Sequence, residues 1–277
     1  MRKLHVLMKK EELDGQRLDG KVVIVLDILF ATTTIVAALS AGATEVWPAR
    51  DGDAARALAA QQGDQPHLLA GELYAETLSG FAPATPLAVL ARLPAQGRLI
   101  YATTNGTVAL TRARGAAHVY AAALLNAQAV VDHIARQHPD DTLLIVCSGS
   151  ADRFNLEDFY GAGYLVSLFR QAGVRDFTDA ARAAEWMHAA TPTPAPALTQ
   201  PVWAAACWKR ACPTSWTMPR NAASATSCPI WSKACCARSP ATEACRAGRC
   251  ASGRVRSRGC QNWNSVRPSP RLVWRWL

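Results

Sequence analysis

Short apolar runs alternate with alanine-rich segments along the chain from Lys21 to Gly173. Runs dominated by Val, Ile and Leu, such as KVVIVLD, predict buried strands, and segments such as TTTIVAALSAG predict helices. Strands are expected at 21–27, 43–49, 67–72, 98–106, 118–126 and 142–150, and helices at 32–42, 53–63, 107–115, 127–137 and 154–173. This alternation is typical of an α/β fold, and we predict a three-layer α/β/α arrangement with a largely parallel or mixed sheet.

Polar side chains gather where the predicted strands end. These residues are Asp27, Glu72, Thr103, Thr104, Asn105, Asn126 and the adjacent pair Glu157 and Asp158. The carboxyl ends of neighbouring parallel strands share one edge of a sheet, and ligands bind there. We therefore expect these side chains to lie near a common edge.

Two similar segments, FATTTIVAAL from Phe30 and YATTNGTVAL from Tyr101, each stand at a predicted strand-to-helix turn. Free backbone N–H groups at helix starts and threonine hydroxyls beside them favour anions. Gly106 would allow a ligand to approach the backbone closely. The alternative for either turn alone is that threonine and asparagine only cap a helix. Two such turns together favour a phosphate site.

Asp27 interrupts a strand that is otherwise made of Val, Ile and Leu. An unpaired carboxylate buried there would cost several kcal/mol, so a compensating partner is expected. Mg²⁺ is the natural candidate, because it takes one or two carboxylates together with water and phosphate oxygens. Glu72, Glu157 and Asp158 could supply further oxygens, although Asp158 is equally explained as a charge at a helix start.

Composition divides the chain at about residue 200. Of 30 basic and 21 acidic residues, 13 basic and one acidic residue lie in 201–277, which leaves 17 basic and 20 acidic residues in 1–200. Eight of nine Cys and seven of nine Trp also lie in 201–277. We predict an α/β domain over 1–200, truncated at its C-terminal end, and an irregular, disordered tail over 201–277.

The tail has three interpretations. A zinc or disulfide module is disfavoured because the tail has no CxxC pair and no His. Nucleic-acid binding is disfavoured because no periodicity would hold the basic and Trp residues on one face. Trp and Cys codons both begin with TG, so a shifted frame turns them largely into Leu, Met or Val, with a stop admitted at the Thr242–Glu243 junction. We therefore hypothesise a frameshift near Gln200.

No apolar run approaches the roughly 18 residues that a membrane helix needs, since VVIVLDILFA is short and contains Asp27. The first residues have too short an apolar core for a signal peptide, and Cys147 is the one thiol in 1–200. Cys147 is expected to be a buried structural thiol because no basic partner is identifiable. We expect a cytoplasmic protein with neither a membrane nor a nucleic acid as partner.

The segments VLDILFATTTIVAALSAGATEV, LAGE, YATTNGTVAL, LLNAQAV and CSGS followed by FNLEDFYGAG resemble, in this order and spacing, the 2-phosphosulfolactate phosphatase family. The resemblance runs from about Val22 to Arg170. It implies a Mg²⁺-dependent hydrolase that converts 2-phospho-3-sulfolactate to 3-sulfolactate and phosphate on the route to coenzyme M.

Residue roles follow from this resemblance. It implies metal or acid/base roles for Asp27, Glu72, Glu157 and Asp158, with Asp27, Glu157 and Asp158 as the catalytic set. It implies phosphate or substrate contacts for Thr32, Thr33, Thr103, Thr104, Asn105, Gly106, Thr107 and Asn126. The substrate would be a small phosphorylated acid, and a homo-oligomer is left open.

The chain departs from the family pattern at two positions. Phe30 stands where Arg is expected, and Leu73 stands where a basic residue is common. Arg153, beside the FNLED turn, is the expected substitute. Because the missing cations would suit a sulfonate or carboxylate, a phosphatase for a different small phosphorylated acid is an alternative. A haloacid-dehalogenase-like enzyme would need a second acid where Leu29 stands. Two further hypotheses are a non-catalytic phosphometabolite-binding protein and an inactive frameshifted product.

Overall fold

The computed structural model describes residues 3–191 and 193–200. The predictions made for 201–277, including the disordered tail and the frameshift, lie outside the described residues.

The larger sheet is entirely parallel and has the strand order β7-β2-β8-β1-β9. Its strands are β1 (Lys3–Leu7), β2 (Lys21–Leu26), β7 (His118–Ala122), β8 (Thr142–Cys147) and β9 (Asp176–Phe177). The interior strand β2 is buried on both faces, which explains its continuous apolar sequence. Val22, Ile24 and Leu26 enter one core, and Val23 and Val25 enter the other.

The smaller sheet has the order β3-β6-β4-β5. It consists of β3 (Glu45–Ala49), β4 (His67–Leu73), β5 (Glu76–Thr77) and β6 (Arg98–Ala102). β3, β6 and β4 are parallel, and the short β5 pairs antiparallel with β4. β5 therefore forms one edge of an otherwise parallel sheet.

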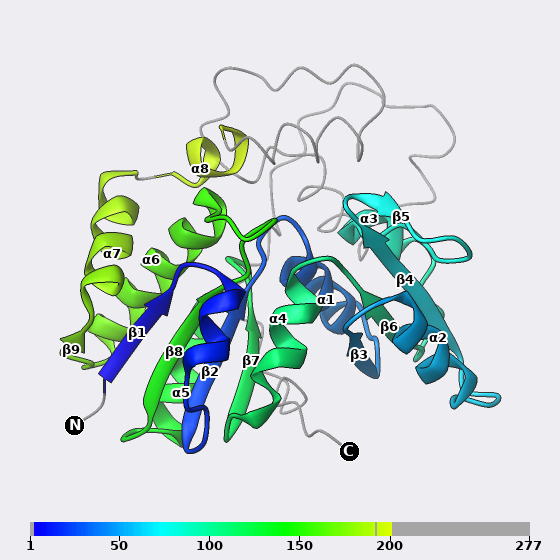
Figure 1. Ribbon diagram of the computed structural model, residues 1–277, viewed down its shortest axis with the longest axis horizontal. Coiled ribbons are helices and arrows are strands. Elements are labelled where there is room, and N and C mark those ends of the chain that lie inside the picture. Colours follow the sequence, from blue (N-terminus) through cyan, green and yellow to red (C-terminus); the bar gives the residue numbers. More distant parts are fainter. Residues whose placement is uncertain (1–2, 192, 201–277) are drawn as a thin grey trace, which may run out of the picture.

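Helices α1 (Ala31–Ser40) and α4 (Gly106–Arg112) lie between the two sheets, as Figure 1 shows. Their apolar side chains share a core with β2, β7 and β8 on one side and with β3, β4 and β6 on the other. This shared layer fixes the two sheets relative to each other, because helix burial on two opposite faces leaves little freedom to slide.

The remaining helices cover the outer faces. α5 (Ala127–Gln137), α6 (Leu156–Gln171) and α7 (Asp179–Ala190) pack on the larger sheet, and α2 (Gly52–Ala60) packs on the smaller one (Figure 1). The short elements are η1 (Lys10–Gly15), η2 (Ala113–Gly115), α3 (Pro86–Leu90) and α8 (Ala195–Thr199). No helix in the described part of the chain is long and apolar enough to cross a bilayer.

The predicted α/β class and the largely parallel pairing are confirmed. The strands are, however, divided between two sheets, whereas the sequence pattern predicted one common edge for the polar residues. The FATTT turn follows β2 in the larger sheet, and the YATTNGT turn follows β6 in the smaller one. The two turns approach each other because α1 and α4, which begin at them, pack in the same layer.

Candidate active site

Asp27 follows β2 and is buried beside the start of α1. Its Oδ1 accepts a hydrogen bond from the backbone N–H of Ala31 at 3.1 Å, which orients the carboxylate. Burial raises the pKa of Asp27 to about 6; the nearby Glu72 carboxylate also raises it, while the Ala31 N–H and the charge of Lys10 oppose the shift. Burial thus disfavours the charged form of Asp27, and a bound cation would offset this effect.

The threonine hydroxyls of the first turn bond to the backbone. Thr32 Oγ1 donates to the carbonyl of Asp27 and accepts from its N–H, both at 2.9 Å. Thr33 Oγ1 donates to the carbonyl of Ile28 at 2.9 Å. Neither side chain lines the cavity described below. These threonines shape the loop that places Asp27, and their predicted contact with phosphate stays a prediction.

The second turn is closed in a similar way. Thr107 Oγ1 accepts from the backbone N–H of Thr103 at 2.8 Å and donates to the Thr103 carbonyl at 3.0 Å. Gly106 packs directly on the first turn: an added Cβ would lie 2.5 Å from the Cβ of Ala31 and 2.6 Å from Oδ2 of Asp27. Only glycine allows this approach, so Gly106 joins the two turns across the two sheets.

Glu72, near the end of β4, is tied to the second turn. Its Oε1 accepts the N–H of Thr104 at 2.7 Å, and its Oε2 accepts the Thr104 hydroxyl at 2.9 Å and the N–H of Ala75 at 2.6 Å. Tyr74 and Ala75 have positive φ angles of 52° and 64°, which non-glycine residues rarely adopt. The Glu72 carboxylate therefore also stabilises a strained turn at the cavity edge.

Glu157 and Asp158 occupy the first turn of α6 but have different surroundings. Asp158 accepts the N–H of Ile28 at 2.9 Å and of Gly149 at 3.2 Å, so both its oxygens brace loops. Oε2 of Glu157 is buried and has no hydrogen-bond partner among the described residues. Burial and then the Asp27 charge raise the pKa of Asp158 well above its usual range, and burial likewise raises the pKa of Glu157 to about 7.

A cavity of about 370 Å³ connects these elements. Six of the predicted site residues line it: Asp27, Glu72, Thr103, Thr104, Asn105 and Glu157. Six others, Thr32, Thr33, Gly106, Thr107, Asn126 and Asp158, are buried but absent from the lining. Arg153 is exposed and also outside the lining, whereas Phe30 is part of the wall and Leu73 is exposed.

Asn126 has a local structural part. Its Oδ1 accepts the N–H of Ala123 at 2.8 Å, and its Nδ2 donates to the carbonyl of Ala121 at 3.2 Å. The side chain thus closes the turn between β7 and α5. Cys147, at the end of β8, is a buried free thiol as predicted, and burial raises its pKa, which makes it a poor nucleophile.

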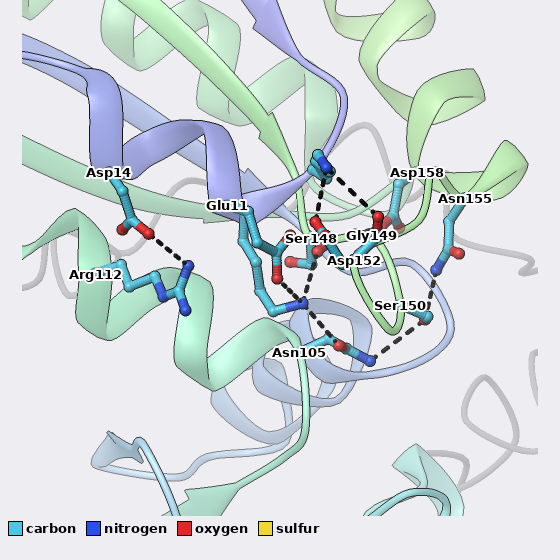
Figure 2. Close-up of polar contacts among 12 residues, drawn as sticks. Glu11, Asp14, Asn105, Arg112, Ser148, Gly149, Ser150, Asp152, Asn155 and Asp158 are labelled. Carbon is cyan, nitrogen blue, oxygen red and sulfur yellow. Dashed lines mark hydrogen bonds and ion pairs between the residues drawn. The ribbon is translucent and has the colours of Figure 1, made fainter.

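The sequence pattern does not single out Lys10, Ser150 or Arg92. Lys10 is only 5% exposed and donates to Oδ1 of Asn105 at 3.0 Å. Ser150 Oγ accepts from Nδ2 of Asn105 at 3.3 Å and of Asn155 at 2.9 Å (Figure 2). Ser150 belongs to the quoted CSGS segment, but Lys10 lies in an amino-terminal stretch of mixed charge whose pattern does not indicate burial.

The donor set of the cavity bears on whether a divalent cation fits. Among the described residues, no three His, Cys, Asp or Glu side chains converge as metal ligands. A two-carboxylate arrangement still fits Mg²⁺, which commonly takes one or two carboxylates and completes its shell with water and phosphate. Asp27 and Glu157 both line the cavity, and Glu157 offers an unpartnered oxygen. The four-residue metal set, which includes the fully braced Asp158, stays a prediction.

Comparison with known proteins gives a consistent result. The family model described as 2-phosphosulpholactate phosphatase matches residues 7–204. A Symbiobacterium thermophilum protein is 40% identical over 153 residues, which are 55% of this chain and 65% of the relative. A Prochlorococcus marinus (strain MIT 9303) protein is 40% identical over 150 residues, 54% of this chain and 61% of the relative. A Deinococcus radiodurans protein is 38% identical over 179 residues, 64% and 73% respectively.

Each of these relatives bears the name "Probable 2-phosphosulfolactate phosphatase". The chain spans 65% and 61% of the length of the first two. The matched region includes both threonine turns and all the carboxylates of the site.

Proposed function

This chain belongs to the 2-phosphosulpholactate phosphatase family, and from that membership we propose that it is a phosphoric monoester hydrolase acting on 2-phospho-3-sulfolactate. Water would attack phosphorus, the phosphorus–oxygen ester bond would break, and the products would be 3-sulfolactate and phosphate. The observation that supports this reaction is the cavity lined by Asp27, Glu72 and Glu157 between two threonine turns. We also propose that the reaction belongs to the route to coenzyme M and takes place in the cytoplasm.

We propose Mg²⁺ as the cofactor, held by Asp27 and Glu157. When bound, the ion would neutralise phosphoryl oxygens and orient the attacking water. The residues of the chain prepare this site: the Ala31 N–H fixes Asp27, and Asp158 braces the backbone at Ile28 and at Gly149. Without the ion, Glu157 would hold a proton near neutral pH, because its pKa is raised to about 7. Cation binding would therefore release protons.

The test is phosphate release from 2-phospho-3-sulfolactate by the purified full chain, with Mg²⁺ and with EDTA. We expect Mg²⁺-dependent release that Asp27→Asn abolishes. Asp14→Asn is the matched control, because Asp14 is exposed and pairs with Arg112 outside the cavity. Circular dichroism should show that both variants fold.

Two further outcomes are informative. A folded chain that binds the substrate in calorimetry without releasing phosphate would favour a phosphometabolite-binding protein. A chain that neither binds nor hydrolyses it would contradict the proposed function. The binding measurement matters because the chain spans less than two thirds of the first two relatives.

A further inference from the structure

Acidic side chains outnumber basic side chains in the lining of the cavity. Three carboxylates line it, and Arg92 is the one basic side chain among the described lining residues. Arg92 follows the carboxyl end of α3 and is exposed. The uncharged lining residues are both polar, such as Thr85, and apolar, such as Phe30 and Ala88. The cavity therefore combines three carboxylates, which suit a cation, with one guanidinium.

The segment that precedes α3 is anchored to two neighbouring elements. The carbonyl of Ala84 accepts hydrogen bonds from Thr34 Oγ1 at 3.0 Å and from the Tyr101 hydroxyl at 2.5 Å. Thr34 belongs to α1 and Tyr101 to β6, and both are fully buried. The segment before α3 is thus anchored to α1, which begins at the first threonine turn, and to β6, which ends at the second.

The guanidinium retains unused donors. Nη1 of Arg92 donates to the carbonyl of Ala88 at 3.1 Å, within its own helix turn. Among the described residues, this is the one hydrogen bond that the Arg92 side chain makes, so Nε and Nη2 remain available. A guanidinium with two free N–H groups matches the planar oxygens of a carboxylate or the oxygens of a sulfonate.

We infer that Arg92 is a specificity-determining residue that binds a second anionic group of the substrate, a carboxylate or a sulfonate, away from the phosphate. This inference rests on the proposed function and names the substrate class of the same site. The three carboxylates of the cavity would repel a second anionic group, and Arg92 offsets this repulsion by binding it. Phosphomonoesters that carry a second anion are therefore preferred over those that do not.

The experiment compares Arg92→Gln and Arg92→Lys with wild type. The control is Arg136→Gln, an exposed arginine on α5 outside the cavity lining, which makes the same change of net charge. Steady-state kinetics are measured with 2-phospho-3-sulfolactate and 2-phospholactate, which carry a second anion, and with phenyl phosphate, which does not.

We expect Arg92→Gln to raise KM about 10- to 100-fold for the two acids with little change in kcat, since charge-assisted hydrogen bonds are lost. KM for phenyl phosphate should stay unchanged. Arg92→Lys should recover part of the loss, because it keeps the charge but not the fork. Equal effects on all three substrates, or no effect on any, would overturn the inference.

Binding calorimetry with 3-sulfolactate separates this inference from the proposed function. If no substrate is hydrolysed, the proposed function fails. Weaker 3-sulfolactate binding by Arg92→Gln than by wild type would then still support Arg92 as an anion site. Undiminished binding in that variant, or no binding by wild type, would refute the assignment.

Discussion

Gly106 is the residue at which the two halves of the site meet. No side chain fits there, because its Cβ would lie 2.5 Å from Ala31 Cβ and 2.6 Å from Oδ2 of Asp27. Both neighbours belong to a turn that is itself held by hydrogen bonds between side chains and the backbone. The contact therefore couples the carboxylate of one sheet to the turn of the other.

Gly106→Ala should lower the free energy of unfolding by about 1 to 3 kcal/mol, as expected for overpacking. It should also reduce phosphate release, because Asp27 must shift. Gly115→Ala is the control, since an added Cβ there would meet only Leu18, at 3.8 Å or more. Urea denaturation and the phosphate assay check both variants. Equal stability of the two variants would show that the turns can separate without penalty.

The contribution of Glu157 to the free energy of unfolding depends on pH. Its pKa is raised from 4.5 to about 7, mainly by burial, so the folded protein holds a proton that the unfolded chain releases. The resulting contribution to stability is complete below pH 4.5 and is lost as pH rises through about 7.

Glu157→Gln should weaken this pH dependence, because glutamine does not ionise. The metal-free variant should match or exceed wild type in stability at pH 8 while losing activity. Urea midpoints in EDTA between pH 5 and pH 8 measure the effect. If the urea midpoint of the variant fell with rising pH as steeply as that of wild type, Glu157 would not be the source of the pH dependence.

At the scale of elements, η1 anchors the site from outside the two turns. Lys10 pairs with Glu11 at 3.0 Å and donates to Asn105 at 3.0 Å, while Lys9 pairs with Asp152 at 2.7 Å. The Lys10 side chain is 6% exposed, whereas those of Lys9 and Asp152 are 33% and 69% exposed. The two adjacent lysines thus differ in burial rather than in charge.

Lys10→Met should lower the free energy of unfolding by about 1.5 to 3 kcal/mol, because hydrogen bonds from a buried charged donor are lost. It should also lower activity, since Asn105 keeps its hydrogen bond to Ser150 but loses the one to Lys10. Lys9→Met is the matched control and should change stability by at most about 1 kcal/mol, as is usual for an exposed pair. Chemical denaturation and the phosphate assay report both effects, and equal losses in the two variants would contradict this account.

At the scale of the whole molecule, the composition changes at about residue 200 and the family match ends at 204. These two boundaries nearly coincide. They support the frameshift hypothesis, which concerns residues outside the described part of the chain.

Sequencing the source DNA across codons 190 to 245 should reveal one base gained or lost near Gln200. The corrected chain should unfold at a higher temperature and hydrolyse substrate faster than the present one, because it would restore the remaining packing surface. An unchanged reading frame would show that the account of the tail is wrong. Metal binding by the tail cysteines would then need to be measured.

Sequence alone predicts the α/β class, the strand-to-helix turns and all three carboxylates that line the cavity. These features follow from local patterns: the apolar run of β2, with Asp27 at its end, needs no distant contact to be recognised. Turn threonines and Gly106 were likewise visible, because turn chemistry depends on neighbours along the chain.

The roles of those residues, by contrast, depend on the tertiary structure. Glu157 and Asp158 are adjacent, yet one faces the cavity and the other braces two loops, because successive helix residues point in different directions. The division into two sheets, the burial of Lys10 and the entry of Arg92 into the wall depend on packing between distant segments. Such contacts leave no periodic trace in a single sequence, so only the folded arrangement reveals them.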